Sequence, residues 1–393
     1  MSSSMSAEMS DSMWLKSHGV AGSVCIVLPQ RGTDYDEAGS ILACIVQESG
    51  RPARVLRDGD PAILDSDALI LFGKCSAFTQ SARLLGAHPA RRPVTVLWHI
   101  EPLLPGVLPD RAVMTARRLA QCDWNLLPAP FASMARYVPA HNLLRDAARS
   151  ALSVRLKRLA GWDAEPAYAD VHPRQWHHAA QHYLWLRQWH SHDWCDLVAA
   201  GTMPRCDLLR QMGICCEYAP LGHHPAWGED LGVERDIDVL FLGRVKRTSR
   251  RRILRRLGRR LQDRGIRLVL IERDCHGPDR TRLLSRTRIA LDIVQHAWEM
   301  PILRLLISTA CGAMVVSNWT SDPHPFRAEH LVQADPDAFI DIILYYLNHE
   351  SERRAIAESA RCFITSELAW HPVVWHVLRR GREHFEARSG VLP

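Results

Sequence analysis

The sequence predicts an α/β protein with two domains, each built around a parallel β-sheet. Apolar runs of strand length recur in both halves of the chain, separated by segments with helical spacing. Several of these runs end in Gly, Ser or another polar residue, as residues 236–244 and 310–317 do. Ligands of parallel sheets bind at this carboxyl edge. The length of 393 residues exceeds that of one typical domain, which favours two.

The composition is that of an ordinary globular protein, with 47% hydrophobic and 23% charged residues. The net charge of +6 favours anionic partners such as phosphates, without requiring nucleic acid. The cysteines show no C-x-x-C pair and no Cys/His metal spacing, and no apolar run approaches the roughly 20 residues of a membrane span. Residues 1–20 open with a polar stretch that lacks the features of a signal peptide, and we expect them to be disordered. These observations predict a reduced, cytoplasmic protein.

The first domain is expected over residues 21–221. The prolines that follow His99 forbid strand or helix, so residues 99–105 form a loop at the carboxyl end of a strand. Asp34 is a plausible N-cap for the helix after the first strand. Strands are expected at 23–28, 52–56, 68–72, 94–98, 196–200 and 216–221, and helices at 35–48, 110–120, 141–161, 174–190 and 204–212.

A turn-rich, non-periodic linker at 222–234 leads into a second domain over residues 235–370. The final segment, 371–393, contains an amphipathic stretch that could cross back to the first domain. Strands are expected in the second domain at 239–242, 268–271, 289–294, 313–317 and 331–332, and helices at 250–264, 278–285, 301–311, 335–348 and 350–366.

Several motifs carry a resemblance to a known family. They are Tyr-Ala-Pro-Leu-Gly at 218–222, Arg-Asp-Ile-Asp-Val-Leu-Phe-Leu-Gly at 235–243, Arg-Leu-Leu-Ile-Ser-Thr-Ala-Cys-Gly at 304–312, and Leu-Trp-His-Ile-Glu-Pro-Leu at 97–103. Over these residues the chain resembles GT-B-type glycosyltransferases, specifically the CgeB-like group among the glycosyltransferase family 1-like proteins. The resemblance is strongest from about residue 216 to residue 378.

The resemblance implies two Rossmann-like domains that face each other across a cleft. The second domain would bind a nucleotide-diphospho-sugar donor, and the first would hold a hydroxyl acceptor. No metal or other cofactor is implied, because helix N-termini and basic side chains can balance the diphosphate charge. One departure concerns Ile307, where many relatives carry an acid that bonds the ribose of the donor. Glu299 is the nearest acidic substitute.

Donor binding is expected where strands end and helices begin in the second domain. There a glycine lets the backbone approach the phosphates, and Arg and Lys neutralise them. The alternative for these positions is an ordinary turn with solvated charges, a carboxylate favourable to a helix dipole, or a structural histidine. The candidate donor-binding residues are Gly243, Arg244, Lys246, His296, Glu299, Arg304 and Ser317.

His99 and Glu101 are the candidates for acceptor chemistry. Transfer with inversion needs a base for the acceptor hydroxyl, and both follow a strand of the first domain. Asp34 and Glu37, after the first strand, compete for this role, and a plain loop carboxylate is the alternative for Glu101. Transfer with retention would need no such base, and the sequence does not distinguish the two.

The helix expected at 250–264 has a basic face of seven arginines between Arg250 and Arg260. A solvated face is the simplest interpretation, and contact with an anionic membrane surface is the main alternative. The first arginines could also touch the donor diphosphate. No aromatic platform accompanies the run, so we expect no specific nucleic-acid binding. The helix expected at 174–190 is rich in aromatic residues, and its His178 and His182 have the spacing of two ligands of one metal ion. No third ligand is visible, so we expect both histidines to serve in packing.

Two main classes of function remain open at this point, together with a weaker third, a nucleic-acid binder that acts through the arginine face between Arg250 and Arg260. The first is an enzyme that transfers a sugar from a nucleotide-sugar to a hydroxyl acceptor in the cleft between the two domains. The second is a protein on the same scaffold that binds a nucleotide or a phosphorylated ligand without turnover, which the departure at Ile307 keeps open.

Overall fold

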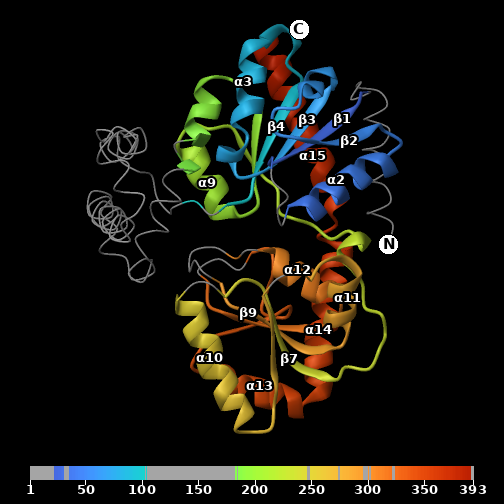
Figure 1. The fold of residues 1–393 in the computed structure, drawn as a ribbon, viewed down its shortest axis with the longest axis vertical. Coiled ribbons are helices and arrows are strands. Elements are labelled where there is room, and N and C mark those ends of the chain that lie inside the picture. The colour runs from blue at the N-terminus through green and yellow to red at the C-terminus, as the bar shows by residue number, and fades with distance from the viewer. Residues whose placement is uncertain are drawn as a thin grey trace, which may run out of the picture.

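The computed structural model describes residues 22–30, 35–101, 103, 182–183, 185–245, 248–272, 275–294, 300, 302–320 and 324–390. These residues form two lobes, each with a parallel β-sheet at its centre (Figure 1). The α/β fold with two Rossmann-like sheets is therefore confirmed. The helices expected at 110–120 and 141–161 lie outside the described residues.

The first sheet has six strands in the order β2-β1-β3-β4-β5-β6, and all neighbours are parallel. Alternate residues of a strand point to opposite faces, so Ile26 packs in one apolar cluster and Val27 in another. The strands are β1 (Val24–Leu28), β2 (Ala53–Arg57), β3 (Ala68–Gly73), β4 (Val94–His99), β5 (Leu197–Ala200) and β6 (Cys216–Tyr218).

Helices cover both faces of this sheet. One face packs against α2 (Asp36–Glu48), and the other against α3 (Thr79–Ala87) and α9 (Met203–Gln211). The helix α3 was not expected from the sequence. The helix expected at 174–190 is described from residue 182 and ends at residue 191.

The second sheet has five strands in the order β11-β10-β9-β7-β8, again all parallel. Its strand order changes direction between β7 and β9. In open α/β sheets, the crevice at such a switch point is where ligands bind. The strands are β7 (Ile237–Leu242), β8 (Leu268–Ile271), β9 (Thr287–Asp292), β10 (Met314–Asn318) and β11 (Val332–Ala334).

The helices of the second lobe lie on both sides of its sheet (Figure 1). The expected start at residue 335 is wrong for one of them, because residues 336–338 form a turn and the helix begins at Phe339. The helices are α10 (Thr248–Gln262), α11 (Gly277–Ser285), α12 (Ile302–Ala310), α13 (Phe339–Asn348) and α14 (Glu350–Ser366). Within the described residues, no helix is long and apolar enough to cross a membrane.

The last helix, α15 (Trp370–Ser389), returns to the first lobe, where it packs on β4 and β5 (Figure 1). The chain thus crosses between the lobes twice, and the two crossings pair. The N–H of His223 donates to the carbonyl of Leu368 at 2.7 Å, and the N–H of Trp370 donates to the carbonyl of His223 at 2.8 Å. Gly222 makes this approach possible, because a Cβ there would lie 2.5 Å from the Cα of Trp370.

Aromatic residues fill the junction at these crossings. Trp370 is fully buried, stacks on Trp227 at 5.6 Å between ring centroids, and meets Phe72 and Trp98 edge-on. The tract 222–234 is therefore anchored by a buried tryptophan rather than being a loose tether. Such aromatic pairs contribute about 0.5–1.5 kcal/mol beyond their burial.

A buried arginine adds a polar contact between the lobes. Arg280 of α11 forms an ion pair with Glu37 of α2, with 2.8 Å between Nη2 and Oε1, and donates to the carbonyl of Trp227 at 2.6 Å. Glu37 is thus engaged by the partner domain, which argues against its role as the competing base.

Candidate functional site

The carboxyl edge of the second sheet forms the site at the switch point between β7 and β9. Gly243 directly follows β7 with φ at +140°, and its N–H donates to the carbonyl of Ile271 at 2.8 Å. Residues with a side chain rarely adopt this conformation. A Cβ at Gly243 would also lie 2.8 Å from Nη2 of Arg304. The glycine therefore lets the backbone and this guanidinium come together at the sheet edge.

Arg304 lies in the first turn of α12 and is held from two strands. Its Nε donates to the carbonyl of Leu242 at 2.7 Å, and its Nη1 forms an ion pair with Asp292 at the end of β9. The guanidinium also stacks over the ring of Phe241 at 5.1 Å. These contacts engage Nε and Nη1 and fix the position of the guanidinium across the switch point.

Asp292 is a site residue that the sequence analysis did not select. It is 0% exposed, and Oδ2 has no hydrogen-bonding partner in the described part of the chain. A buried carboxylate with an unpaired oxygen calls for a functional explanation. The signal in the sequence was an acid at the end of an otherwise apolar strand. The strand was predicted, but the acid was not interpreted.

Arg250 differs from the expectation for the basic helix. It is buried rather than part of a solvated face, and it donates to the carbonyl of Ile293 from Nε at 2.9 Å and to that of Arg244 from Nη1 at 3.0 Å. Its guanidinium also lies 5.5 Å from the ring centroid of Phe241. Arg250 therefore ties the loop after β7 to the end of β9, which makes it a brace of the site.

The remaining donor-side candidates have mixed outcomes. Arg244 has an exposed side chain beside Gly243. Ser317 is fully buried, and its hydroxyl donates to the carbonyl of Asn318 at 3.1 Å, so the expectation that it faces a donor is wrong. Asn318 instead accepts the N–H of Val294 at 2.7 Å and caps the end of β9. Lys246, His296 and Glu299 lie outside the described residues.

Ile307, the departure from the family pattern, is 6% exposed and packs in the apolar core. The position of the expected acid thus faces the protein interior here.

In the first domain, Glu101 and His99 have different environments. Glu101 is half-buried, and its carboxylate accepts a hydrogen bond from the hydroxyl of Tyr35 at 2.6 Å. His99 is 0% exposed and lies among buried side chains, so the expectation that it opens into the cleft is wrong. Burial, together with nearby His182 and Arg205, holds the pKa of His99 well below its usual range. The competing candidate Asp34 lies outside the described residues.

The carboxyl edges of the two sheets meet at one described contact. The hydroxyl of Tyr218, the last residue of β6, lies 3.0 Å from Nδ1 of His324, which follows β10 in the second domain. Both edges therefore border the space between the lobes, as an enzyme with two ligands would require.

Comparison with known families adds a finding for the second domain. Residues 244–377 match the family described as glycosyl transferase-like. The chain therefore carries a glycosyl transferase-like domain, which confirms the resemblance for this half. The narrower CgeB-like group stays a prediction. No curated protein matches the chain.

The solved structures to which this chain is similar include the following three. The structure of Anabaena HepE in complex with UDP-glucose is 10% identical with a TM-score of 0.47, covering 94% of this chain and 100% of that one. An α-glucosyltransferase in complex with UDP is 8% identical with a TM-score of 0.44, covering 94% and 99%. TarM is 10% identical with a TM-score of 0.41, covering 51% of this chain and 46% of that one, so the match spans about half of TarM. Each score lies below 0.5.

Proposed function

We propose that this chain, with its glycosyl transferase-like domain, transfers a sugar from a nucleotide-diphospho-sugar to a hydroxyl acceptor between its two domains. The observation that carries the proposal is the fixed guanidinium of Arg304 at the switch point of the second sheet. Ligands of open α/β sheets bind at this place, and the Arg304 side chain remains 21% exposed.

Arg304 is suited to hold the donor diphosphate without a metal. Leu242 and Asp292 take Nε and Nη1, and Nη2 points toward Gly243, where a Cβ would obstruct it. A guanidinium has five N–H donors, so it can serve its protein partners and a phosphate together. Asp292 offsets part of the positive charge, and Arg244 beside the glycine adds another cation. We infer that the diphosphate is bound by these arginines and by backbone N–H groups.

Glu101 is the proposed base for the acceptor hydroxyl. The hydroxyl of Tyr35 donates to Oε1, which orients the carboxylate. Oε2 would then accept the proton of the acceptor hydroxyl as the acceptor oxygen bonds to the sugar carbon. The bond from that carbon to the nucleoside diphosphate breaks, and the diphosphate leaves as an anion held by Arg304. This assignment applies to transfer with inversion. Tyr35 acts through Glu101 and is a positioning residue.

Donor binding and transfer can be tested separately. The full chain is titrated with UDP-, GDP- and TDP-sugars by thermal shift, because a ligand of the native state raises the melting temperature. Glu101→Gln should keep the shift and lose transfer to an acceptor, since the base is gone but the donor site is intact. Glu358→Gln, on the surface of α14, is the matched control and should keep both.

If transfer continues unchanged in Glu101→Gln, Glu101 is not the base for the acceptor hydroxyl. The alternative function, a nucleotide-binding protein without turnover, predicts saturable shifts with no product in any variant.

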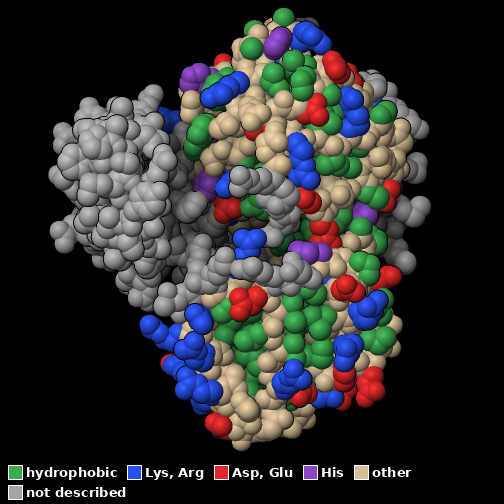
Figure 2. All heavy atoms as spheres, in the orientation of Figure 1, with side chains coloured by type: hydrophobic (Ala, Val, Ile, Leu, Met, Phe, Trp, Pro, Cys, Tyr) green, Lys and Arg blue, Asp and Glu red, His purple; other side chains and the backbone are tan. Residues whose placement is uncertain are grey.

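A cytoplasmic location, with contact to the inner face of an anionic membrane, is part of the proposal. Arginine side chains gather on the side of the second lobe where α10 lies (Figure 2). Leu270 of the edge strand β8 is 43% exposed and lines a groove together with Arg255 and Arg259 of α10. Cations beside an exposed apolar residue suit an anionic lipid surface.

Co-sedimentation with vesicles tests this contact. Binding should require anionic lipid and weaken in Arg255→Gln/Arg259→Gln. Equal binding to neutral vesicles, or tighter binding to duplex DNA than to anionic vesicles, would refute it.

A further inference from the structure

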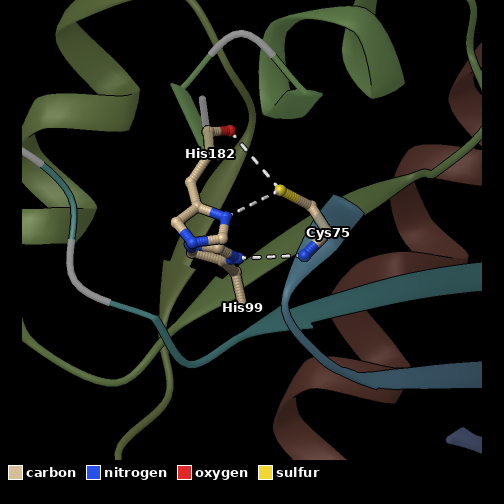
Figure 3. A group of neighbouring side chains, drawn as sticks. All are labelled: Cys75, His99 and His182. Carbon is tan, nitrogen blue, oxygen red and sulfur yellow. Dashed lines mark hydrogen bonds between the residues drawn. The ribbon is translucent and has the colours of Figure 1, made fainter. Parts of the chain in front are cut away.

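A thiol and two imidazoles meet inside the first domain, where β3 and β4 end (Figure 3). Cys75 begins the short 3-10 helix after β3, His99 is the last residue of β4, and His182 lies in the helix before β5. One donor atom from each lies within 4.8 Å of the other two. We propose that Cys75, His99 and His182 bind one metal ion of the class that prefers thiolate and imidazole ligands, zinc first.

The distance between Cys75 and His182 is close to that needed for such an ion. Sγ of Cys75 lies 3.9 Å from Nδ1 of His182. In a tetrahedral zinc site, bonds of about 2.3 Å to sulfur and 2.0–2.1 Å to nitrogen place the two ligand atoms roughly 3.6 Å apart. The rings of His99 and His182 lie 5.4 Å apart between centroids and are tilted by 59°. A shift of a few tenths of an ångström would bring the thiol and imidazole to ligand spacing.

Within the described residues, the hydrogen-bonding capacity of the His99 imidazole is only partly used. Cys75 and His99 are 0% exposed and His182 is 4% exposed, within an otherwise apolar cluster. The Cys75 thiol donates weakly to the carbonyl of His182 at 3.4 Å, and the Cys75 N–H reaches Nδ1 of His99 at 3.4 Å. Nε2 of His99 has no hydrogen-bonding partner in the described part of the chain. A buried imidazole nitrogen without a partner is unfavourable, and a metal ion bound at that nitrogen would satisfy it.

Metal ions bind the neutral form of imidazole. Burial, His182 and Arg205 lower the pKa of His99. Burial raises the pKa of the Cys75 thiol, which is therefore protonated without a metal. Binding of a divalent ion forms the sulfur–metal bond and releases the thiol proton to solvent, and no electron is transferred.

Such an ion would fasten three separate segments of the first domain. Its ligands would join the end of β3, the end of β4 and the helix before β5. Glu101 follows β4 two residues after His99, so the ion would also steady the loop that carries it. No third ligand for His182 is apparent in the sequence, because Cys75 and His99 come from distant parts of the chain. Its suggested partner, His178, lies outside the described residues.

Cobalt provides the first test, with the full chain stripped by a chelator and titrated with Co²⁺. We expect one tightly bound equivalent with intense visible bands and a near-ultraviolet sulfur-to-cobalt charge-transfer band, and displacement of cobalt by Zn²⁺. Cys75→Ser should lose the charge-transfer band. Cys206→Ser removes a buried thiol of the same apolar cluster and should keep it. Cys44→Ser, in a second thiol–carboxylate–imidazole cluster with Glu48 and His224, should also keep it.

X-ray absorption of zinc-loaded Cys44→Ser protein gives a second readout that does not depend on how Cys75→Ser folds. One sulfur at about 2.3 Å with nitrogen or oxygen at about 2.0–2.1 Å is expected. No bound metal, a shell without sulfur, or a folded Cys75→Ser variant that keeps the charge-transfer band would overturn the proposal.

Discussion

Replacing Arg304 with methionine should destabilise the second domain and weaken donor binding, and a second substitution should restore only the stability. Methionine keeps much of the apolar stem, so the main loss is the guanidinium. Its removal leaves the carboxylate of Asp292, which is 0% exposed, without its partner. Breaking a buried ion pair at one end costs about 3–5 kcal/mol. Arg304 is 21% exposed, so we expect a value near the lower end, about 3 kcal/mol.

The double variant Arg304→Met/Asp292→Asn separates the two effects. Asparagine removes the buried charge, so most of the lost stability should return, and the cycle of variants measures the coupling. Donor binding should not return, because the phosphate still lacks its cation. A hydrogen bond to a charged group is worth about 1.5–3 kcal/mol, which corresponds to roughly a 10- to 150-fold weaker Kd.

Urea denaturation and titration with UDP-sugars measure the two quantities on the same samples. Two results would refute the reasoning. One is a single variant as stable as the wild type, because the pair would then be unimportant. The other is a double variant that binds the donor as tightly as the wild type, because Arg304 would then not touch the phosphates.

Three further predictions concern the glycine, a carboxylate and the junction. Because of the positive φ, Gly243→Ala should lower the free energy of unfolding by about 1–3 kcal/mol and weaken donor binding. Gly258→Ala is the control inside α10, where the new Cβ would lie 3.7 Å from its nearest neighbour. In urea denaturation it should leave the stability unchanged or raise it by up to about 1 kcal/mol. Equal effects of the two would contradict this account. Burial opposes ionisation of Glu217, but the hydrogen bond and charge of Arg380 outweigh it and lower the pKa of Glu217 below its ordinary 4.5. The carboxylate of Glu217 therefore stabilises the fold above pH 4.5, and this stabilisation is lost as the pH falls below that value. Glu217→Gln should then flatten the acid limb of a plot of stability against pH. An unchanged acid limb would show that the pair of Glu217 and Arg380 does not stabilise the fold. Because Trp370 is fully buried, Trp370→Ala should lower the free energy of unfolding by about 3–5 kcal/mol. A loss below about 1 kcal/mol would show that the aromatic junction contributes little to stability.

The sheets could be predicted from the sequence because buried parallel strands are continuous apolar runs. The helix α3 was missed because its sequence lacks a comparable apolar pattern. Its buried face consists of Ser81, Ala82 and Leu85, so it lacks the apolar stripe that marks most helices. Small residues can cover a sheet without producing a periodic signal.

The site was predictable in part. A strand that ends in glycine before a helix indicated Gly243, and the family motif indicated Arg304. His99 and Ser317 were placed wrongly because the end of a strand does not determine which face a side chain occupies. Asp292 could be interpreted only once β7 and β9 were known to be neighbours across the switch point.

The return of α15 makes the first domain discontinuous in sequence. The second domain is, in effect, inserted between β6 and the helix that completes the core of the first. A fragment ending before Trp370 would leave Val96 and Leu197 without the helix backbone that lies against them at Gly381. During synthesis on the ribosome, the first domain must therefore wait for the whole of the second before it can close. If the two domains are expressed separately, α15 should therefore accompany the first domain. It can be fused to that domain by circular permutation or supplied by co-expression.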